Sequence, residues 1–308
     1  MIGSMSTVSV CIVTYNSASD IKDCLQAVLK QSFPITSIIV VDNASSDETC
    51  RIVHQFGEQV RLTANKVNNG FAGGQNQAMA QTDSDYVIVL NPDVTLHPDY
   101  VSEIVGYMDQ RPEVGSATGQ LVSAEQPDTM DSAGLAMRRN RQAYDLGAGE
   151  PAVAWQSEQE VFGVSGAAAV YRKTMMLDVS YDGQFFDEVF FAYKEDVDAA
   201  WRAQHFGWKA IYVPSAKAYH RRGWKKGGRR SIPLFVRRHS YQNRFFTLIK
   251  NEPAGWHWFW LLPLLLVSEL AKLGYIAVLE PGLLRCWPFI LRKFPHFLRK
   301  RRSILGRK

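Results

Sequence analysis

Residues 7–16 read TVSVCIVTYN, a β-rich apolar run that ends in a polar turn. The next segment, residues 20–30, places its apolar residues at helical spacing, and residues 35–41 form a continuous apolar run. A continuous run is typical of a strand that is buried on both faces of a parallel sheet. The order strand, helix, strand therefore predicts an α/β domain.

The alternation of strand and helix patterns continues through residue 110. Because short connections join these segments, we expect a mostly parallel sheet with helices on both faces. Residues 120–160 are polar and irregular, and we expect loops or a small subdomain there. The other elements that the sequence predicts are helices at 47–56, 70–81, 98–110 and 195–205 and strands at 60–65, 86–90, 161–171 and 209–213.

Polar clusters follow the predicted strands at the point where each strand ends. In sheets of this kind, ligands bind beyond the carboxyl ends of the strands, so the clusters predict a binding site along that edge. The clusters are Thr14-Tyr15-Asn16, Asp42-Asn43, Asn68-Asn69-Gly70 and Asn91-Pro92-Asp93.

Two of these clusters suggest binding chemistry, and each also has an ordinary structural interpretation. The glycines within residues 70–74 would let the backbone approach an anion at a helix N-terminus, or would simply form a turn. Asp93 offers the carboxylate oxygens that a hard divalent cation prefers, or belongs to an ordinary turn. The sequence matches neither the Walker phosphate-binding loop nor the dinucleotide-binding fingerprint.

Three carboxylates, Glu195, Asp196 and Asp198, fall within four residues at a predicted helix start. Neighbouring side chains on a helix point about 100° apart, so we expect only one of Glu195 and Asp196 to face a given cleft. The helix N-terminus favours an ionised carboxylate, which suits a general base; helix capping is the alternative. His220 follows the next strand and could serve a metal or a phosphate, or be structural.

Charge is distributed unevenly along the chain. Residues 217–308 contain 21 of the 35 Lys and Arg but three of the 30 Asp and Glu, a net charge of +18, whereas residues 1–216 carry −13. This split predicts a catalytic body with a basic extension that meets a polyanion, either a nucleic acid or an anionic lipid surface.

The most apolar part of the chain is residues 256–279. Its uncharged stretch, residues 253–268, is shorter than the roughly 20 residues that span a bilayer, and we expect Pro263 to interrupt it. Three tryptophans at its start suit the headgroup region of a membrane. The sequence therefore predicts in-plane membrane binding rather than a span, with a soluble helical subdomain packed on the core as the alternative.

The four cysteines, at positions 11, 24, 50 and 286, form no CxxC pair and are expected to be reduced thiols of a cytosolic protein. Residues 1–4 precede Met5 and are interpreted as residues left by cloning. The first apolar run alternates with polar residues, so it predicts a strand and not a secretory signal.

Six segments in register resemble glycosyltransferase family 2, and within it the bacterial rhamnosyltransferase-like branch. One such segment has little specificity, whereas six in order across residues 5–250 are specific. Residues 237–243 (RRHSYQN) also resemble the connecting region of these enzymes. The six segments are Val10–Asn16 (VCIVTYN), Val40–Thr49 (VVDNASSDET), Asn68–Asn76 (NNGFAGGQN), Val89–Asp93 (VLNPD), Val164–Arg172 (VSGAAAVYR) and Phe191–Arg202 (FAYKEDVDAAWR).

The resemblance implies the GT-A fold of nucleotide-diphospho-sugar transferases, an α/β fold in which helices flank a mostly parallel sheet. It implies a catalytic domain at residues 5–220, with a nucleotide-binding half at 5–110 and an acceptor half at 111–220. A basic, amphipathic and membrane-associated helical extension would then occupy residues 221–308.

The resemblance also implies roles for individual residues. Asp196 would be the general base, with Glu195 the less favoured choice, and Asp93 and His220 would hold Mg²⁺ or Mn²⁺. The first acid of the family's D-x-D motif is Asn91 here, an amide that attracts a metal more weakly. The residues implied to contact the nucleotide sugar are Thr14, Tyr15, Asn16, Asp42, Asn69, Gly70, Asn76 and Asn91.

The implied activity is that of an inverting hexosyltransferase at the inner face of a bacterial cell membrane. It would move a sugar from a nucleotide diphosphate to a hydroxyl of a lipid-linked or cell-envelope glycan, with dTDP-rhamnose as the first expected donor and a UDP-sugar as the next. A non-catalytic module that binds nucleotide sugars is the alternative. Nucleic acid is not an expected partner, because the aromatic and apolar bulk of the basic extension suits lipid better.

Overall fold

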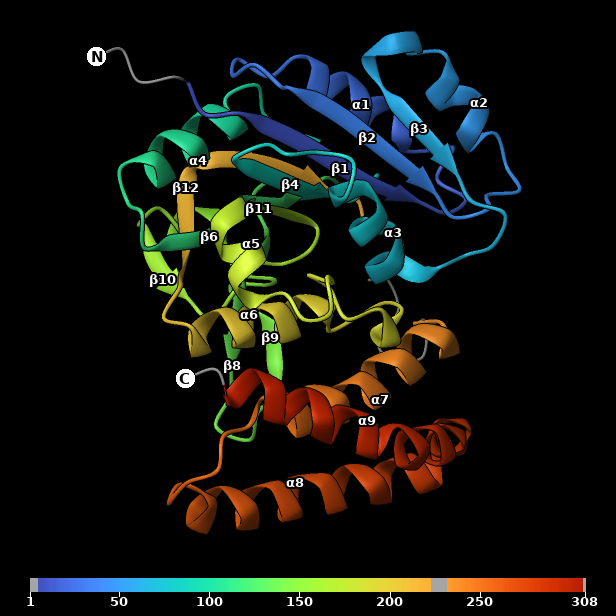
Figure 1. Ribbon diagram of the computed structural model, residues 1–308, viewed down its shortest axis with the longest axis vertical. Helices are drawn as coiled ribbons and strands as arrows, with labels where there is room; N and C mark the ends of the chain where they lie inside the picture. Colours follow the sequence, from blue (N-terminus) through green and yellow to red (C-terminus); the bar gives the residue numbers. More distant parts are fainter. Residues whose placement is uncertain (1–4, 223–231, 307–308) are drawn as a thin grey trace.

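The computed structural model describes residues 5–222 and 232–306, and its first half follows the predicted alternation (Figure 1). Residues 1–4, interpreted above as a cloning remnant, lie outside the described residues, as do 223–231 and 307–308. The elements of the first half are β1 (Val8–Thr14), α1 (Ile21–Leu29), β2 (Ser37–Asp42), α2 (Thr49–His54), β3 (Arg61–Ala64), α3 (Gly70–Met79), β4 (Tyr86–Leu90), β5 (Val94–Leu96) and α4 (Tyr100–Asp109).

The second half contains more strands than the sequence pattern predicts. Residues 120–160, expected to be loops or a small subdomain, hold several short strands, and the strand expected at 161–171 is divided in two. The division occurs because its two parts pair with different strands of the sheet. The elements are β6 (Val114–Ser123), β7 (Met130–Ser132), β8 (Leu135–Met137), β9 (Ala143–Asp145), β10 (Gln159–Val161), β11 (Ala168–Arg172), α5 (Lys173–Val179), α6 (Glu195–His205) and β12 (Lys209–His220).

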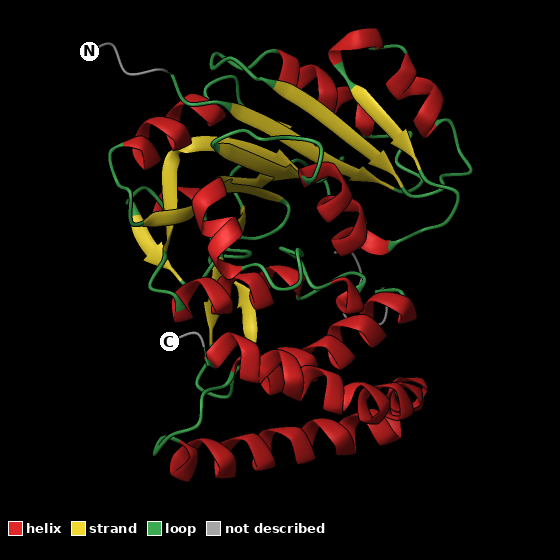
Figure 2. Cartoon of the chain, viewed as in Figure 1, coloured by secondary structure: helices red, strands yellow, loops and turns green. Residues whose placement is uncertain are grey.

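Ten strands of the described chain form one sheet, parallel in its first half and mixed in its second (Figure 2). β3, β2, β1 and β4 are neighbours in that order and run parallel, so Thr14 lies opposite Asp42 where their strands end. The second half is mixed because β11 lies between β4 and β6 and runs antiparallel to both. The expected parallel arrangement therefore describes only the half that holds the first strands.

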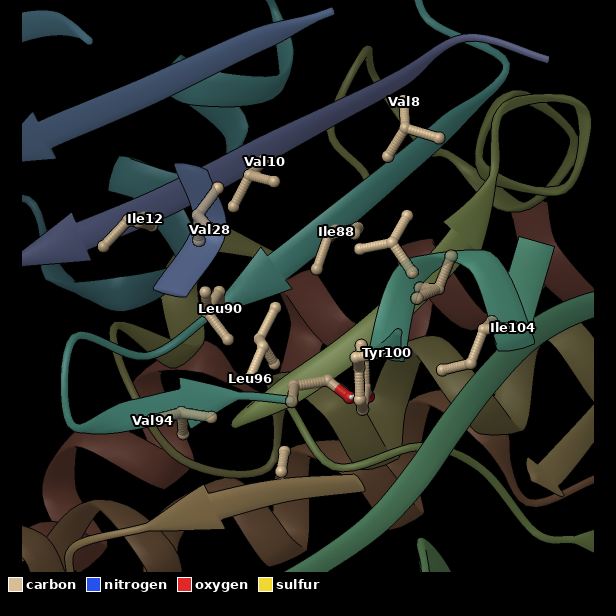
Figure 3. Close-up of a cluster of buried hydrophobic side chains, with 14 of the residues drawn as sticks. Val8, Val10, Ile12, Val28, Ile88, Leu90, Val94, Leu96, Tyr100 and Ile104 are labelled. Carbon is tan, nitrogen blue, oxygen red and sulfur yellow. Dashed lines mark hydrogen bonds between the residues drawn. The ribbon is translucent and has the colours of Figure 1, made fainter. Parts of the chain in front are cut away.

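Helices cover both faces of the sheet, and an apolar core lies against each face. Figure 3 shows one of these cores, which includes Val10 and Ile12 of β1, Ile88 of β4 and Ile104 of α4. Every residue of β1 and β4 is buried, as expected of strands with helices on both sides. The strand ends are therefore anchored by packing, which gives the polar residues that follow them fixed positions.

Three helices follow the sheet: α7 (Leu234–Asn251), α8 (Trp258–Leu279) and α9 (Trp287–Leu305). In Figure 1, α7 and α9 lie between α6 and α8, and α8 is the outermost element. The rings of Phe246 on α7 and Phe297 on α9 stack with their centroids 4.3 Å apart, and Phe190 packs against both. α7 and α9 are thus docked through an aromatic core on the segment that precedes α6.

The expectation that Pro263 would interrupt the apolar segment is wrong, because α8 is one continuous helix of 22 residues. Pro263 lies near the start of α8, so its missing N–H removes a single hydrogen bond close to the helix end. Within the described residues, α8 is the one helix that is long and apolar enough to cross a membrane. Most of its large apolar side chains are exposed, so α8 does not fit the alternative of a packed soluble subdomain.

Candidate active site

A cavity of about 1290 Å³ runs from the carboxyl ends of the parallel strands to α7 and α8. Thr14, Tyr15 and Asn16 line it where β1 ends, and Asn91 and Asp93 line it after β4. The start of α6 forms the facing part of the wall with its first two carboxylates. The fold therefore brings together polar residues that are far apart along the chain, as the strand-end pattern predicts.

Asp42 lies beneath the cavity and not on its wall. It is 1% exposed, and the hydroxyl of Thr14 donates to its Oδ1 at 2.8 Å. The backbone N–H of Ser45 donates to its Oδ2 at 2.9 Å, so both oxygens of Asp42 are engaged. The neighbouring Asn43, which the sequence reasoning did not select, lines the cavity instead. Asp42 thus fixes Thr14 and the loop that follows β2, and its contact with a nucleotide stays a prediction.

Tyr15 and Asn16 form an exposed turn at the end of β1. The ring of Tyr15 is 56% exposed on the cavity wall. Asn16 has a positive φ of 52°, and its Oδ1 accepts a hydrogen bond from the N–H of Ser46 at 2.8 Å. A short polar side chain tolerates this backbone conformation best, so Asn16 holds the turn that presents Tyr15 to the cavity.

The glycine-rich segment divides between the cavity and a second site. Gly70 lines the cavity with a φ of +75°, and a Cβ there would lie 2.4 Å from the carbonyl oxygen of Phe191, so only glycine fits. Asn69 and Asn76 line a separate, smaller hollow. Asn76 exchanges hydrogen bonds with the backbone of Phe186 at 2.7 and 3.0 Å. Of the three residues predicted to contact the nucleotide sugar in this segment, Gly70 lines the cavity, whereas Asn69 and Asn76 lie at the smaller hollow.

Asp93 and His220 lie together at the cavity edge. His220 Nε2 is 3.3 Å from Asp93 Oδ1, and its Nδ1 is 2.8 Å from Oδ2 of Asp131, a buried residue of β7. A carboxylate at one ring nitrogen fixes the ring orientation and leaves the other nitrogen for a metal. The pair therefore fits Mg²⁺ or Mn²⁺, whose preferred ligands include carboxylate oxygens. No sequence pattern had indicated Asp131.

Within residues 5–222 and 232–306, no group of three or more His, Cys, Asp or Glu side chains is placed to hold a metal ion. A cation at Asp93 and His220 would therefore depend on oxygens of the substrate for its remaining ligands. Such dependence is usual for Mg²⁺, which commonly binds through one or two protein groups together with substrate phosphates.

Glu195 and Asp196 both border the cavity, although the helical spacing predicted that only one would. Asp196 is half-buried and accepts hydrogen bonds from the N–H groups of Val197 at 2.7 Å and Gly166 at 3.3 Å. Burial raises the pKa of Asp196 and, together with the neighbouring Asp196 charge, raises the pKa of Glu195 well above its usual range. Burial thus outweighs the helix N-terminus, which was expected to favour ionisation, and it raises the pKa of Glu195 further than that of Asp196.

The loop before α6 has an unusual backbone that α7 stabilises. Phe191, Tyr193 and Lys194 have φ values of 63°, 71° and 74°, in the left-handed region that residues other than glycine rarely adopt. The side-chain amide of Asn243 on α7 donates to three carbonyl oxygens of this loop at 2.8–2.9 Å. Asn243 belongs to the RRHSYQN segment recognised in the sequence, but only the structure shows that it holds the loop that positions Asp196.

The opposite face of α6 carries a buried cluster of ion pairs. Asp198 contacts Lys250 at 2.8 Å and Arg202 at 3.0 Å. Asp187 contacts Lys250 at 2.9 Å and Lys300 at 2.8 Å. Burial opposes the charged form of Asp198, but the charges of Lys250 and Arg202 outweigh burial and lower its pKa. The cluster joins α6 to α7 and α9.

A family model described as glycosyl transferase family 2 matches residues 9–176. An N-acetylglucosaminyl-diphospho-decaprenol L-rhamnosyltransferase of Mycobacterium tuberculosis is 27% identical over 275 residues, which covers 82% of this chain and 86% of that protein. A poly-beta-1,6-N-acetyl-D-glucosamine synthase of Staphylococcus epidermidis is 23% identical over 212 residues, 68% of this chain and 48% of that protein.

Solved structures share the fold at lower identity. TarS residues 1–349 of S. aureus in complex with UDP superposes with a TM-score of 0.60 at 16% identity, covering 97% of this chain and 83% of that one. The mannosyltransferase PcManGT of Pyrobaculum calidifontis with GDP-Man and Mn2+ gives a TM-score of 0.59 at 17% identity, covering 98% and 85%. These likenesses establish a GT-A architecture for the chain.

Proposed function

Because the chain belongs to glycosyl transferase family 2 and is therefore a glycosyltransferase, we propose that it is an inverting enzyme of cell-envelope glycan synthesis. The observation that carries this proposal is that Asp93 and Asp196 line one cavity at the carboxyl ends of the parallel strands. A nucleotide diphosphate bound at those ends would place its sugar between the two carboxylates.

The proposed donor is dTDP-rhamnose, and the support for it is the 27% identical relative that is named an L-rhamnosyltransferase. The TarS structure contains UDP, which makes a UDP-sugar the second choice. Thr14, Tyr15, Asn16 and Asn43 would form the nucleotide end of the site, with the exposed ring of Tyr15 available to pack on the base.

In the proposed reaction Asp196 accepts the proton of an acceptor hydroxyl while that oxygen attacks the anomeric carbon of the sugar. The bond from the anomeric carbon to the nucleotide diphosphate breaks in the same step, so the configuration inverts and no covalent enzyme intermediate forms. The raised pKa of Asp196 makes its carboxylate a stronger base than that of an ordinary aspartate. Gly166 and Val197 orient the carboxylate through their N–H groups.

Asp93 and His220 would hold Mg²⁺ or Mn²⁺ next to the diphosphate, with Asp131 fixing the imidazole. Such a cation stabilises the negative charge that develops on a departing diphosphate. Asn91 stands where the family has an acid, so the chain supplies one fewer negative charge at this position than a complete D-x-D motif.

We also propose that the protein works on the inner face of the cell membrane, with α8 lying in the membrane plane. The outward face of α8 is apolar over its whole length, with Phe259, Val267 and Val278 each at least 70% exposed. α8 is joined to α7 through the ion pair of Glu269 with Arg244, so a spanning α8 would carry these charges into the hydrocarbon. An in-plane orientation avoids that cost.

Nucleotide binding and turnover test the catalytic proposal. Thermal-shift measurements of the full chain with dTDP, UDP and GDP, each with and without Mn²⁺, should identify one nucleotide that stabilises the protein through mass action. Consumption of the matching nucleotide sugar is then measured. Binding without any turnover on membrane-derived acceptors would support a non-catalytic module instead, and stabilisation by none of the nucleotides would refute the proposed donor site.

Flotation with vesicles of phosphatidylglycerol and phosphatidylethanolamine tests the membrane proposal. Leu270→Glu on α8 and Leu177→Glu on α5 change side chains of equal exposure, 65% and 66%. We expect Leu270→Glu to reduce flotation severalfold, since a charge on the apolar face opposes insertion, and Leu177→Glu to leave it unchanged. Equal flotation of the two variants would exclude α8 as the membrane-binding surface.

A further inference from the structure

α8 forms one end of the catalytic cavity as well as the outer surface of the molecule. Ala271, Lys272, Tyr275 and Ile276 of α8 line the same cavity as Asp196. A molecule that reaches from Asp196 to this end would therefore arrive at a helix whose other face is apolar and exposed.

The polarity of α8 is inverted relative to a helix of a soluble protein. Its charged residues, Glu269 and Lys272, are partly buried and face α7, whereas Leu266, Val267 and Leu270 are more than half exposed. In a soluble helix the apolar stripe faces the core and the charges face water. The arrangement fits a boundary with charged protein on one side of α8 and lipid on the other.

Two cations at this end of the cavity share a single carboxylate. Arg244 Nη2 lies 2.5 Å and Lys272 Nζ 2.9 Å from the same oxygen, Glu269 Oε1. Two other arginines of the wall, Arg141 and Arg237, form ion pairs with Glu252 and Glu280. The pair formed by Arg244 and Lys272 therefore retains a surplus positive charge next to the apolar helix.

We propose that this end of the cavity, at Arg244 and Lys272, binds the phosphate or diphosphate of a lipid-linked acceptor, whose hydrocarbon chain leaves along α8. This assignment rests on the proposed function, since it places the acceptor sugar at Asp196. An anion at Lys272 supplies the missing negative charge, and charge-assisted hydrogen bonds from Lys and Arg are the usual means of holding a phosphate. A hydrocarbon chain attached to that anion would find the apolar residues of α8 and the membrane beside them.

The test uses farnesyl diphosphate as the probe, with the full chain saturated with Mn²⁺ and whichever of dTDP or UDP binds, so that the donor end is filled. Binding is followed by calorimetry for farnesyl diphosphate, farnesol and inorganic diphosphate. We expect farnesyl diphosphate to bind at least about tenfold more tightly than either of its parts, because both the anion and the chain contribute.

Lys272→Gln should weaken binding of farnesyl diphosphate about three- to tenfold, which is the loss of one charge-assisted contact. Lys293→Gln on α9, outside the cavity wall, removes the same charge and should leave binding unchanged. Nucleotide binding by both variants should equal that of the unaltered chain, which also shows that they are folded.

Equal affinity of Lys272→Gln and the unaltered chain, or inorganic diphosphate binding as tightly as farnesyl diphosphate, would overturn the assignment. Retained nucleotide binding in either case would leave the proposed function standing. Failure of the unaltered chain to bind any nucleotide would overturn the proposed function and the acceptor site with it.

Discussion

The two faces of the first turn of α6 place a carboxylate in two different environments. Asp196 borders the cavity, accepts hydrogen bonds from two backbone N–H groups, and has a pKa that burial raises. Asp198 lies two residues later, is fully buried and contacts Lys250 and Arg202, which lower its pKa despite burial. The positions of these two carboxylates in the sequence do not explain the difference in their pKa values. The groups that each carboxylate contacts do explain it.

This difference is consistent with the proposal that Asp196 is the reactive carboxylate, whereas Asp198 is structural. A carboxylate with a raised pKa is less stable as an anion in the folded protein than in the unfolded chain, so ionised Asp196 costs stability at neutral pH. A carboxylate with a lowered pKa contributes stability, as Asp198 does by joining α6 to α7. Substitutions on the two faces should therefore affect different measurements.

The largest expected effect follows from Asp196→Asn. Loss of the general base should reduce transfer about 10²- to 10⁴-fold, while the melting temperature stays equal or rises because a costly buried charge is removed. Initial rates and thermal melting check both parts. Glu195→Gln is the matched comparison, and a greater loss of activity in that variant would reverse the assignment of the base.

On the other face, Asp198→Asn should lower the free energy of unfolding by about 3 kcal/mol, because Arg202 and Lys250 lose a buried counter-charge. Urea unfolding followed by circular dichroism measures this change. Asp23→Asn, at an exposed position of α1, serves as the control and should stay within about 0.5 kcal/mol of the unaltered protein. A destabilisation by Asp198→Asn no larger than that of the control would mean that the cluster does not fasten α7 to α6.

A smaller effect is expected for Lys300→Met on α9. Asp187 would lose one of its two lysine contacts but keep Lys250 at 2.9 Å. The expected destabilisation is about 1.5 kcal/mol, the lower end of the contribution of one hydrogen bond to a charged group, because Lys250 remains in place. If Lys300→Met proved as damaging as Asp198→Asn, the cluster would depend on α9 as much as on α7.

The smallest expected effect is a difference between the pH range in which activity is lost and the pH range in which the protein unfolds. On acidification, Asp196 becomes protonated at a higher pH than an ordinary aspartate does, because its pKa is raised. Activity should fall as this protonation proceeds. The stability contributed by Asp187 and Asp198 persists to lower pH, since their lowered pKa values delay protonation. Rates and circular dichroism in the same buffers should show an acidic range in which the enzyme is folded but slow, and simultaneous loss of both signals would contradict this.

Much of the first half of the fold, from β1 to α4, could be predicted from the sequence. Its parallel strands are continuous apolar runs, and the helices between them have clear periodicity. The segments around Asp93 and Asp196 were recognised from residue patterns, and the structure places both on one cavity. The strands β7, β8 and β9 were missed because each has three residues, which is too short for an alternation of apolar and polar residues to mark it.

The sequence by itself determined the alternating α/β order, the strand-end location of the site and the apolar character of α8, since each depends on the spacing of apolar residues along a short segment. Only the tertiary structure decided that Asp42 is buried under Thr14, that Asp131 orients His220 and that Asn243 holds the loop before α6. These contacts join residues far apart in the chain, and their energies depend on burial and on partners that no local pattern specifies.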